Sequence, residues 1–216
     1  MAKGLELVFI LDKSGSMGGL ESDTIGGFNS MLKKQKAEAG EVTVTTVLFD
    51  NTYELLHDRV SIQAIAPITD KEYQVGGNTA LVDAIGRTIH KIKNAQKHMA
   101  EDFRPEKTLF VIITDGEENS SREYTSERVK ARIERQKEKY GWEFIFWGAN
   151  IDAVETARQY GIDAQYAQNY RADKVGVSVV WGAVAAAVAS SLTTGSTGTE
   201  WKKSAASDFD SRGKKS

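Results

Sequence analysis

The sequence has no cysteine and no marked excess of either charge. Without cysteine the chain forms neither a disulfide nor a thiolate metal site, which fits a reducing compartment, and we expect a cytoplasmic protein. The net charge of −2 gives no general attraction to nucleic acid or to anionic lipid. We also expect no secretory signal, because the apolar run Leu5–Leu11 is short and contains Glu6. The 216 residues, 40% of them hydrophobic, suffice for one globular domain.

Residues 175–192 form an uncharged stretch close to the length of a membrane-spanning helix, for which about 18 consecutive apolar residues are typical. Its composition argues against spanning. Alanine, glycine and serine dominate, leucine occurs once, and flanking aromatic residues are missing. We therefore expect a buried or partner-facing terminal helix and no membrane association.

Strand-like and helix-like segments alternate along the chain. The strand-like segments, rich in Val, Ile, Phe and Thr, are Leu5–Leu11, Val42–Phe49, Leu109–Thr114 and Glu143–Trp147. Between them, apolar residues recur at helical spacing, in the groups Ile25, Phe28 and Leu32; Leu81, Ile85, Ile89 and Ile92; and Val129, Ile133 and Tyr140. This order predicts an α/β fold with a doubly wound, Rossmann-like, mainly parallel sheet and helices on both faces.

One edge of this sheet is expected to be antiparallel. Asp50-Asn51 is a turn dipeptide between Val42–Phe49 and a candidate strand at Tyr53–Leu56, so the chain can double back there. Further on, Asp152 and Glu155 have the spacing of a capping box, which predicts a helix to about Tyr160. A short strand near Ala164–Ala167 and a last helix from about Asp173 complete the alternation.

We assign residues 1–192 to one domain and residues 193–216 to a flexible polar tail. From Thr193 onward the composition shifts to Thr, Gly, Ser, Lys and Asp, with only Trp201 and Phe209 as large apolar residues. Such a segment is not expected to bury enough surface to offset the entropy lost on ordering.

Oxygen-bearing side chains gather at three predicted element boundaries. Asp12, Ser14 and Ser16 follow the first strand, Thr79 precedes the helix that starts near Leu81, and Asp115 follows the strand Leu109–Thr114. Loops at the carboxyl ends of parallel strands meet at one edge of a sheet, so these segments can converge. Mg²⁺ prefers near-octahedral oxygen ligands. The pattern therefore predicts a metal site.

The motifs Asp12-x-Ser14-x-Ser16, Gly-Gly-Asn-Thr79 and Thr-Asp115-Gly resemble the metal-ion-dependent adhesion site (MIDAS) of the von Willebrand factor A (vWA) domain family, over about residues 4–192. The resemblance implies a doubly wound sheet with one antiparallel edge strand, and a site that holds Mg²⁺ or Mn²⁺. It further implies that Ser14 and Ser16 bind the metal directly, that Thr79 is a mobile ligand, and that Asp12 and Asp115 act mostly through water.

If the carboxylates act mainly through water, the bound ion remains electrophilic and has an open position. An Asp or Glu carboxylate of a protein partner would complete the coordination. The resemblance therefore implies a metal-dependent protein–protein interaction module, an intracellular adaptor without catalytic residues and without a cofactor other than the metal.

Two other functions stay open. An Mg²⁺-dependent phosphohydrolase or phosphotransferase would also place an Asp at the end of the first strand. Against it, this chain has Ser14 where the common aspartate-nucleophile arrangement has a second carboxylate, and Gly15–Gly19 lacks the ending of a Walker-type loop. A purely structural protein whose loop ligands remain empty is the third reading.

Residues around the motifs have simpler interpretations. Lys13 is expected to be solvated, and Asp50 and Asn51 are expected to form a turn. Glu117, Glu118 and Asn119 either help to select partners or interact with a helix dipole. The histidines His57, His90 and His98 have no metal-ligand spacing and are expected at the surface.

Overall fold

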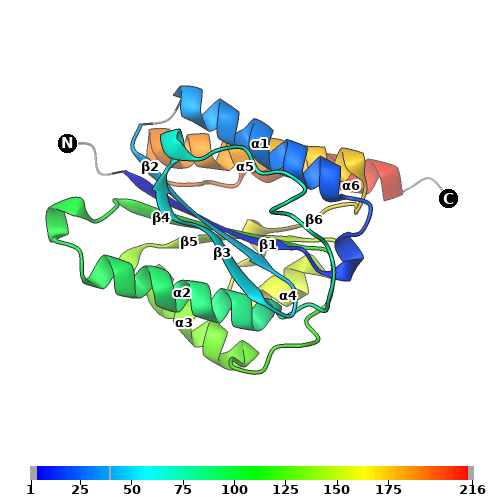
Figure 1. Ribbon diagram of the computed structural model, residues 1–216, viewed down its shortest axis with the longest axis horizontal. Helices are drawn as coiled ribbons and strands as arrows, with labels where there is room; N and C mark the ends of the chain where they lie inside the picture. Colours follow the sequence, from blue (N-terminus) through cyan, green and yellow to red (C-terminus); the bar gives the residue numbers. More distant parts are fainter. Residues whose placement is uncertain (1–3, 39, 214–216) are drawn as a thin grey trace.

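A six-stranded sheet forms the centre of the computed structural model, which describes residues 4–38 and 40–213 (Figure 1). Its strands are β1 (Leu5–Asp12), β2 (Val42–Phe49), β3 (Tyr53–Ser61), β4 (Lys107–Thr114), β5 (Glu143–Gly148) and β6 (Ala167–Asn169). They lie in the order β3-β2-β1-β4-β5-β6. Only β3 is antiparallel to its neighbour, and it follows β2 through the turn at Asp50 and Asn51. The predicted fold class and edge hairpin are confirmed.

Helices cover both faces of the sheet (Figure 1). One face carries α1 (Glu21–Glu38), α5 (Lys174–Thr194) and α6 (Lys203–Gly213), and the other carries α2 (Leu81–Lys97), α3 (Ser126–Tyr140) and α4 (Ala153–Gln159). Short 3₁₀ turns lie at Gly15–Met17 (η1), Ile62–Ala64 (η2), Glu101–Phe103 (η3), Ala164–Tyr166 (η4) and Glu200–Lys202 (η5). Every residue of β1 is buried, because its alternate side chains enter two separate apolar layers.

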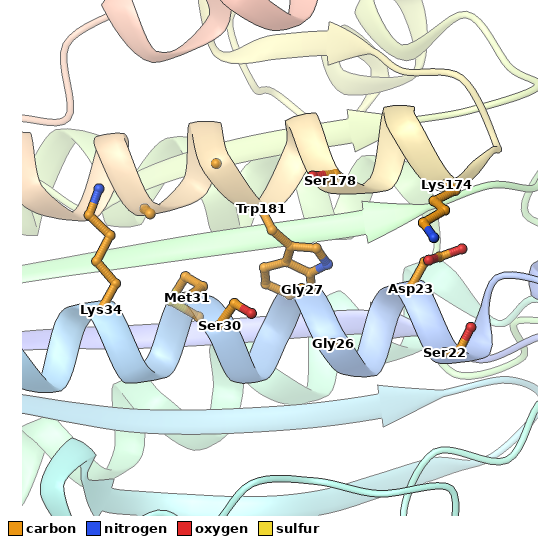
Figure 2. Close-up of a pocket in the computed structure, with 12 residues that line it drawn as sticks. Ser22, Asp23, Gly26, Gly27, Ser30, Met31, Lys34, Lys174, Ser178 and Trp181 are labelled. Carbon is orange, nitrogen blue, oxygen red and sulfur yellow. The ribbon is translucent and has the colours of Figure 1, made fainter.

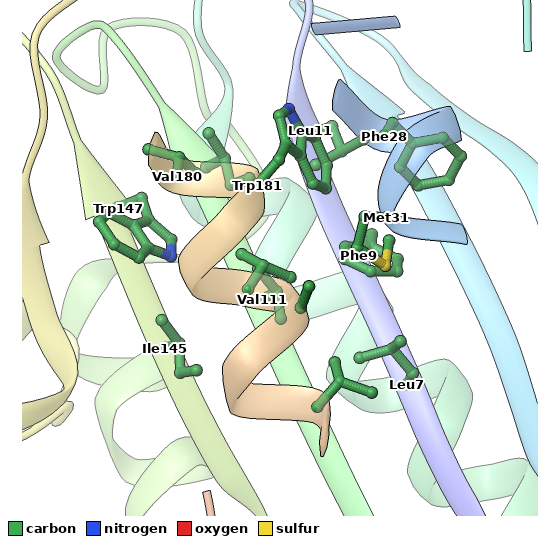
Figure 3. Packing of buried hydrophobic residues seen from close by; sticks show 14 of the residues in the cluster. Leu7, Phe9, Leu11, Phe28, Met31, Val111, Ile145, Trp147, Val180 and Trp181 are labelled. Atoms are coloured by element: carbon green, nitrogen blue, oxygen red, sulfur yellow. The ribbon is translucent and has the colours of Figure 1, made fainter. Parts of the chain in front are cut away.

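The apolar helix α5 is a core element. Among the described residues it is the one helix whose length and composition would allow it to cross a membrane. Its side chains pack in the layer that also holds Phe9 and Val111 of the central strands (Figure 3). Trp181 projects from α5 onto α1, where a Cβ on Gly27 would lie 2.0 Å from the indole Cδ1 (Figure 2). Glycine thus lets the two helices approach closely.

Two aspartates begin helices as the sequence predicts. Asp152 accepts hydrogen bonds from the amides of Val154 and Glu155, at 3.1 and 3.0 Å, and Asp173 accepts one from Gly176 at 2.8 Å. The reciprocal half of the capping box does not form, because the Glu155 carboxylate pairs with Arg158 at 2.7 Å instead.

The expectation of a flexible tail from residue 193 is wrong for the described part of that segment. Residues 200–213 form η5 and α6, and Trp201 is only 4% exposed. The centroids of its ring and of the Trp147 ring are 5.1 Å apart, and its Nε1 donates a 2.9 Å hydrogen bond to the Gly198 carbonyl. Burial of this ring and of Ala205, together with the hydrogen bonds that the Thr197 amide and hydroxyl donate to the Glu143 carboxylate, holds a segment whose composition alone predicts a flexible tail. Residues 214–216 of the expected tail lie outside the described residues.

Candidate metal site

Asp12 ends β1 and is held by the ends of neighbouring segments. The residue is 1% exposed. Its Oδ1 accepts a 2.7 Å hydrogen bond from the Ser14 amide, which turns the chain directly after the strand. Its Oδ2 accepts a 2.5 Å hydrogen bond from the Thr114 hydroxyl at the end of the adjacent strand β4, and the Tyr73 hydroxyl donates to its backbone carbonyl. The carboxylate is therefore fixed before any ligand arrives.

Hydroxyl groups connect the loop after β1 to the loop after β4. Ser16 Oγ donates a 2.6 Å hydrogen bond to Asp115 Oδ1, and Ser14 Oγ lies 3.0 Å from Ser16 Oγ. A hydroxyl has a single proton, and that of Ser16 goes to Asp115, so Ser14 is the donor to Ser16. Ser14 and Asp115 are each 1% exposed, whereas Ser16 is exposed. Solvent therefore reaches this cluster at Ser16.

Thr79 joins the same cluster from the loop before α2. The two loops are tied by a 3.0 Å hydrogen bond from the Gly15 amide to the Gly77 carbonyl. A Cβ built on Gly116 would lie 3.0 Å from Ser16 Oγ and 3.4 Å from Thr79 Oγ1, so both hydroxyls lie against this glycine and a side chain there would crowd them. The structure thus brings together all five residues that the sequence singles out.

Both carboxyl groups of the cluster are destabilised in their charged form. Burial raises the pKa of Asp12, although hydrogen bonds from Ser14 and Thr114 act in the opposite direction. Burial also raises the pKa of Asp115 to about 6; the Ser16 hydroxyl opposes the rise and the negative charge of Asp12 adds to it. Among the described residues, the buried Asp115 Oδ2 has no hydrogen-bond partner. A cation here would offset the cost of two buried negative charges.

The donor set suits a small hard cation. Within residues 4–38 and 40–213, no three His, Cys, Asp or Glu side chains gather in a way that could hold a metal, so a metal at this cluster would depend on hydroxyl oxygens beside two carboxylates. Neighbouring corners of an octahedron with metal–oxygen bonds of ~2.1 Å lie ~3.0 Å apart. The two serine oxygens are already 3.0 Å apart, held by the hydrogen bond between them. Both could therefore bind one Mg²⁺ or Mn²⁺ ion with little movement.

Several residues support the site through contacts that the sequence does not predict. Thr114 and Tyr73 hold Asp12, although Thr114 stood out only as the neighbour of Asp115. Lys13 is not a solvated side chain: its Nζ lies 2.8 Å from a Glu54 carboxylate oxygen, and its side chain is 12% exposed. Only the adjacency of β1, β2 and β3 brings this pair together.

The acidic segment after Asp115 does not begin a helix of its own. Glu118 instead reaches the N-terminus of α2, where its Oε2 accepts a 2.8 Å hydrogen bond from the Val82 amide. The helix-dipole interpretation is thus correct for Glu118, with a different helix from the one that follows it in sequence. Asn150 donates a 3.3 Å hydrogen bond to the Asp115 carbonyl.

Turn formation by Asp50 and Asn51 is confirmed. Asp50 Oδ1 accepts from the Thr52 amide at 2.6 Å, and Asn51 Oδ1 accepts from the Asn78 amide at 3.3 Å, next to Thr79. The edge turn therefore also supports the loop that carries Thr79. His90 and His98 are exposed as expected, and His57 is half-buried.

No family model matches the sequence, and no curated protein matches it. Solved structures with a similar fold include a von Willebrand factor type A protein from Catenulispora acidiphila, with a TM-score of 0.59 and 13% identity over 87% of this chain and 43% of that one. The PilB minor pilin from Streptococcus sanguinis gives 0.58 and 11%, over 90% of this chain and 63% of that one. Proximal thread matrix protein 1 from the mussel byssus gives 0.59 and 13%, over 86% and 48%. This chain spans less than two thirds of each, and the likeness shows a vWA-like α/β fold.

Proposed function

We propose that this protein is a vWA-like interaction module that binds Mg²⁺ or Mn²⁺ through its MIDAS-like cluster and captures a protein partner by an Asp or Glu carboxylate. One observation carries the proposal: neighbouring hydroxyl groups and two buried carboxyl groups with raised pKa values converge from three loops. The vWA-like neighbours support a protein-interaction module in general. Their identity is too low to support the metal site, which rests on the residues of this chain.

In the proposed site, Ser14, Ser16 and Thr79 supply hydroxyl oxygens, while Asp12 and Asp115 balance charge from buried positions. The bound ion would supply an electrophilic centre for a carboxylate. Ser16 is the exposed member of the cluster, so a partner would approach over it. Loss of a proton from Asp115 on metal binding would make affinity rise with pH through about 6, the pKa to which burial raises this group.

Metal binding is tested with Mn²⁺, whose free electron paramagnetic resonance signal falls when protein binds it, and with Mg²⁺ as competitor. We expect Ser16→Ala to weaken Mn²⁺ binding by at least about tenfold, a loss that even outer-shell partners of a metal cause. The exposed Ser207→Ala on α6 is the matched control and should bind as the wild type does. Equal affinity in both variants would contradict the assignment.

Partner capture is tested separately, by affinity purification from cell lysate with Mg²⁺ or with chelator. The proposal expects proteins retained only with Mg²⁺, lost in Ser16→Ala and kept in Ser207→Ala. Replacing the partner's contacting Asp or Glu by its amide should also abolish retention. In a parallel assay, wild-type turnover of p-nitrophenyl phosphate that disappears in Asp12→Asn would instead favour the phosphohydrolase.

A further inference from the structure

The segment that follows Asp115 lies across the N-terminus of α2. We call residues 116–124 the strap. Its closest link to the candidate site is Asn119: the side-chain Oδ1 accepts a 2.9 Å hydrogen bond from the Thr79 amide, and the Asn119 amide donates a 3.0 Å bond back to the Thr79 carbonyl. The Ser120 amide adds a 3.3 Å bond to the same carbonyl. Both backbone polar groups of Thr79 are thus held by the strap.

The strap is itself anchored on the first turn of α2. Glu118 caps that turn through the Val82 amide, because Ala80 at the start of the helix has no polar side chain. The second carboxylate oxygen of Glu118 accepts hydrogen bonds from the amides of Ser120 and Ser121, at 2.9 and 2.7 Å. The strap thereby forms a tight turn at the N-terminus of α2 and provides the cap that the helix's own residues lack.

A second anchor lies one residue further along α2. The Asp83 carboxylate accepts hydrogen bonds from three consecutive strap amides, those of Arg122, Glu123 and Tyr124, at 2.8 to 2.9 Å. The Asp83 amide donates a 2.9 Å bond to Ser121 Oγ. Hydrogen bonds to a charged acceptor contribute more to stability than hydrogen bonds between neutral groups. Movement of the strap relative to α2 would break several of them together.

These contacts argue against Thr79 as a freely moving ligand. The residue is 3% exposed. Its neighbours on both sides are also held, since the Asn78 amide donates to Asn51 Oδ1 at 3.3 Å and the Ala80 amide donates to the Asp50 carbonyl at 2.8 Å. The strap starts at Gly116, directly after Asp115, so it links two candidate metal-bearing loops into one unit.

We infer that Asn119 is a positioning residue that sets the Thr79 hydroxyl for the metal, so that the site is already assembled in the metal-free protein. This inference rests on the proposed function. Removing the Asn119 side chain leaves the backbone bonds between the strap and Thr79 intact and frees only the Thr79 amide. The main consequence is then freedom of the Thr79 backbone and of the hydroxyl it carries.

A double-mutant cycle in Mn²⁺ affinity tests this role. We expect Asn119→Ala to weaken Mn²⁺ binding about tenfold, the lower end of losses for outer-shell partners. Thr79→Ala should also weaken binding, and adding Asn119→Ala to Thr79→Ala should cause almost no further loss, because the positioned oxygen is already gone. A general structural role would give additive losses instead. Asn94→Ala on the outer part of α2 is the matched control.

Hydrogen exchange of the Thr79 amide in metal-free protein gives a readout that is independent of the metal. Exchange should be slow in the wild type and faster in Asn119→Ala, while Asn119→Asp, which keeps the acceptor, should restore protection. Rapid exchange in the wild type, or additive losses in the cycle, would overturn the inference while leaving the metal site standing. A wild type that binds no Mn²⁺ would overturn the proposed function, and the exchange experiment would still report whether Asn119 holds Thr79.

Discussion

Asp115→Asn should stabilise the metal-free protein at neutral pH, although it removes a residue of the candidate site. The buried carboxyl has an ordinary pKa of 3.8, which its surroundings raise to about 6, with burial as the largest cause. At pH 7.5 the folded protein therefore holds a negative charge that the unfolded chain accommodates more easily in water. Asparagine has no such charge, and its Oδ1 can still accept the hydrogen bond from Ser16 that Asp115 accepts at 2.6 Å.

The size of the effect follows from linkage between proton binding and folding. A rise from 3.8 to about 6 corresponds to about 3 kcal/mol at ~1.36 kcal/mol per pKa unit. Because the folded-state pKa of Asp115 is raised, its protonated form stabilises the fold fully below pH ~4, and this contribution is lost as pH rises through about 6. For a chain of this size 1 kcal/mol shifts Tm by ~2–4 °C. The variant should therefore melt roughly 6–12 °C higher at pH 7.5.

The assay is thermal unfolding with a metal chelator, at steps from pH 4 to pH 8. The difference in Tm between Asp115→Asn and the wild type should be near zero at pH 4, grow between pH 4 and 6, and stay constant above pH 7. The exposed Asp70→Asn should show no such gain. With Mg²⁺ added, the wild type should gain stability and the variant should gain little. A lower Tm for Asp115→Asn at pH 7.5, or a gap that does not depend on pH, would refute the electrostatic reasoning.

Two further pairs of substitutions test the packing. Gly27→Ala would place a Cβ 2.0 Å from the Trp181 ring and should lower the free energy of unfolding, measured by urea titration, by about 1–3 kcal/mol. At Gly26 an added Cβ would meet no atom within 4 Å, so Gly26→Ala should stabilise α1 by up to ~1 kcal/mol. Equal effects at the two glycines would contradict the close contact. Trp201→Ala should cost about 3–5 kcal/mol, because its ring is buried, while Phe103→Ala, 76% exposed, should change the same free energy by less than ~0.5 kcal/mol. If Trp201→Ala changes the free energy of unfolding as little as Phe103→Ala does, the result would support a flexible tail after all.

The sequence was sufficient for the five longer strands of the sheet and for the five residues of the cluster, because both depend on local patterns. It placed the short last strand near Ala164–Ala167, where the structure has η4, with β6 following at Ala167–Asn169. Nearly continuous apolar runs predict strands that are buried on both faces, and their alternation with helical patterns predicts parallel neighbours. Once β1 and β4 are neighbours, Asp12 at the end of β1 and Asp115 directly after β4 must meet at one edge of the sheet. The same reasoning failed for the tail, because a composition averaged over residues 193–216 does not show that Trp201 packs against the rest of the fold.

The sequence by itself determined the order of strands and helices up to α5 and the oxygen donors at their ends, since a strand or helix records its period and its boundary in neighbouring residues. Only the tertiary structure decided how those donors are supported. Tyr73 reaches Asp12, Trp201 reaches Trp147, and Asn119 holds Thr79, each across many intervening residues. Such contacts depend on where distant segments lie in space, and a local pattern carries no record of that position.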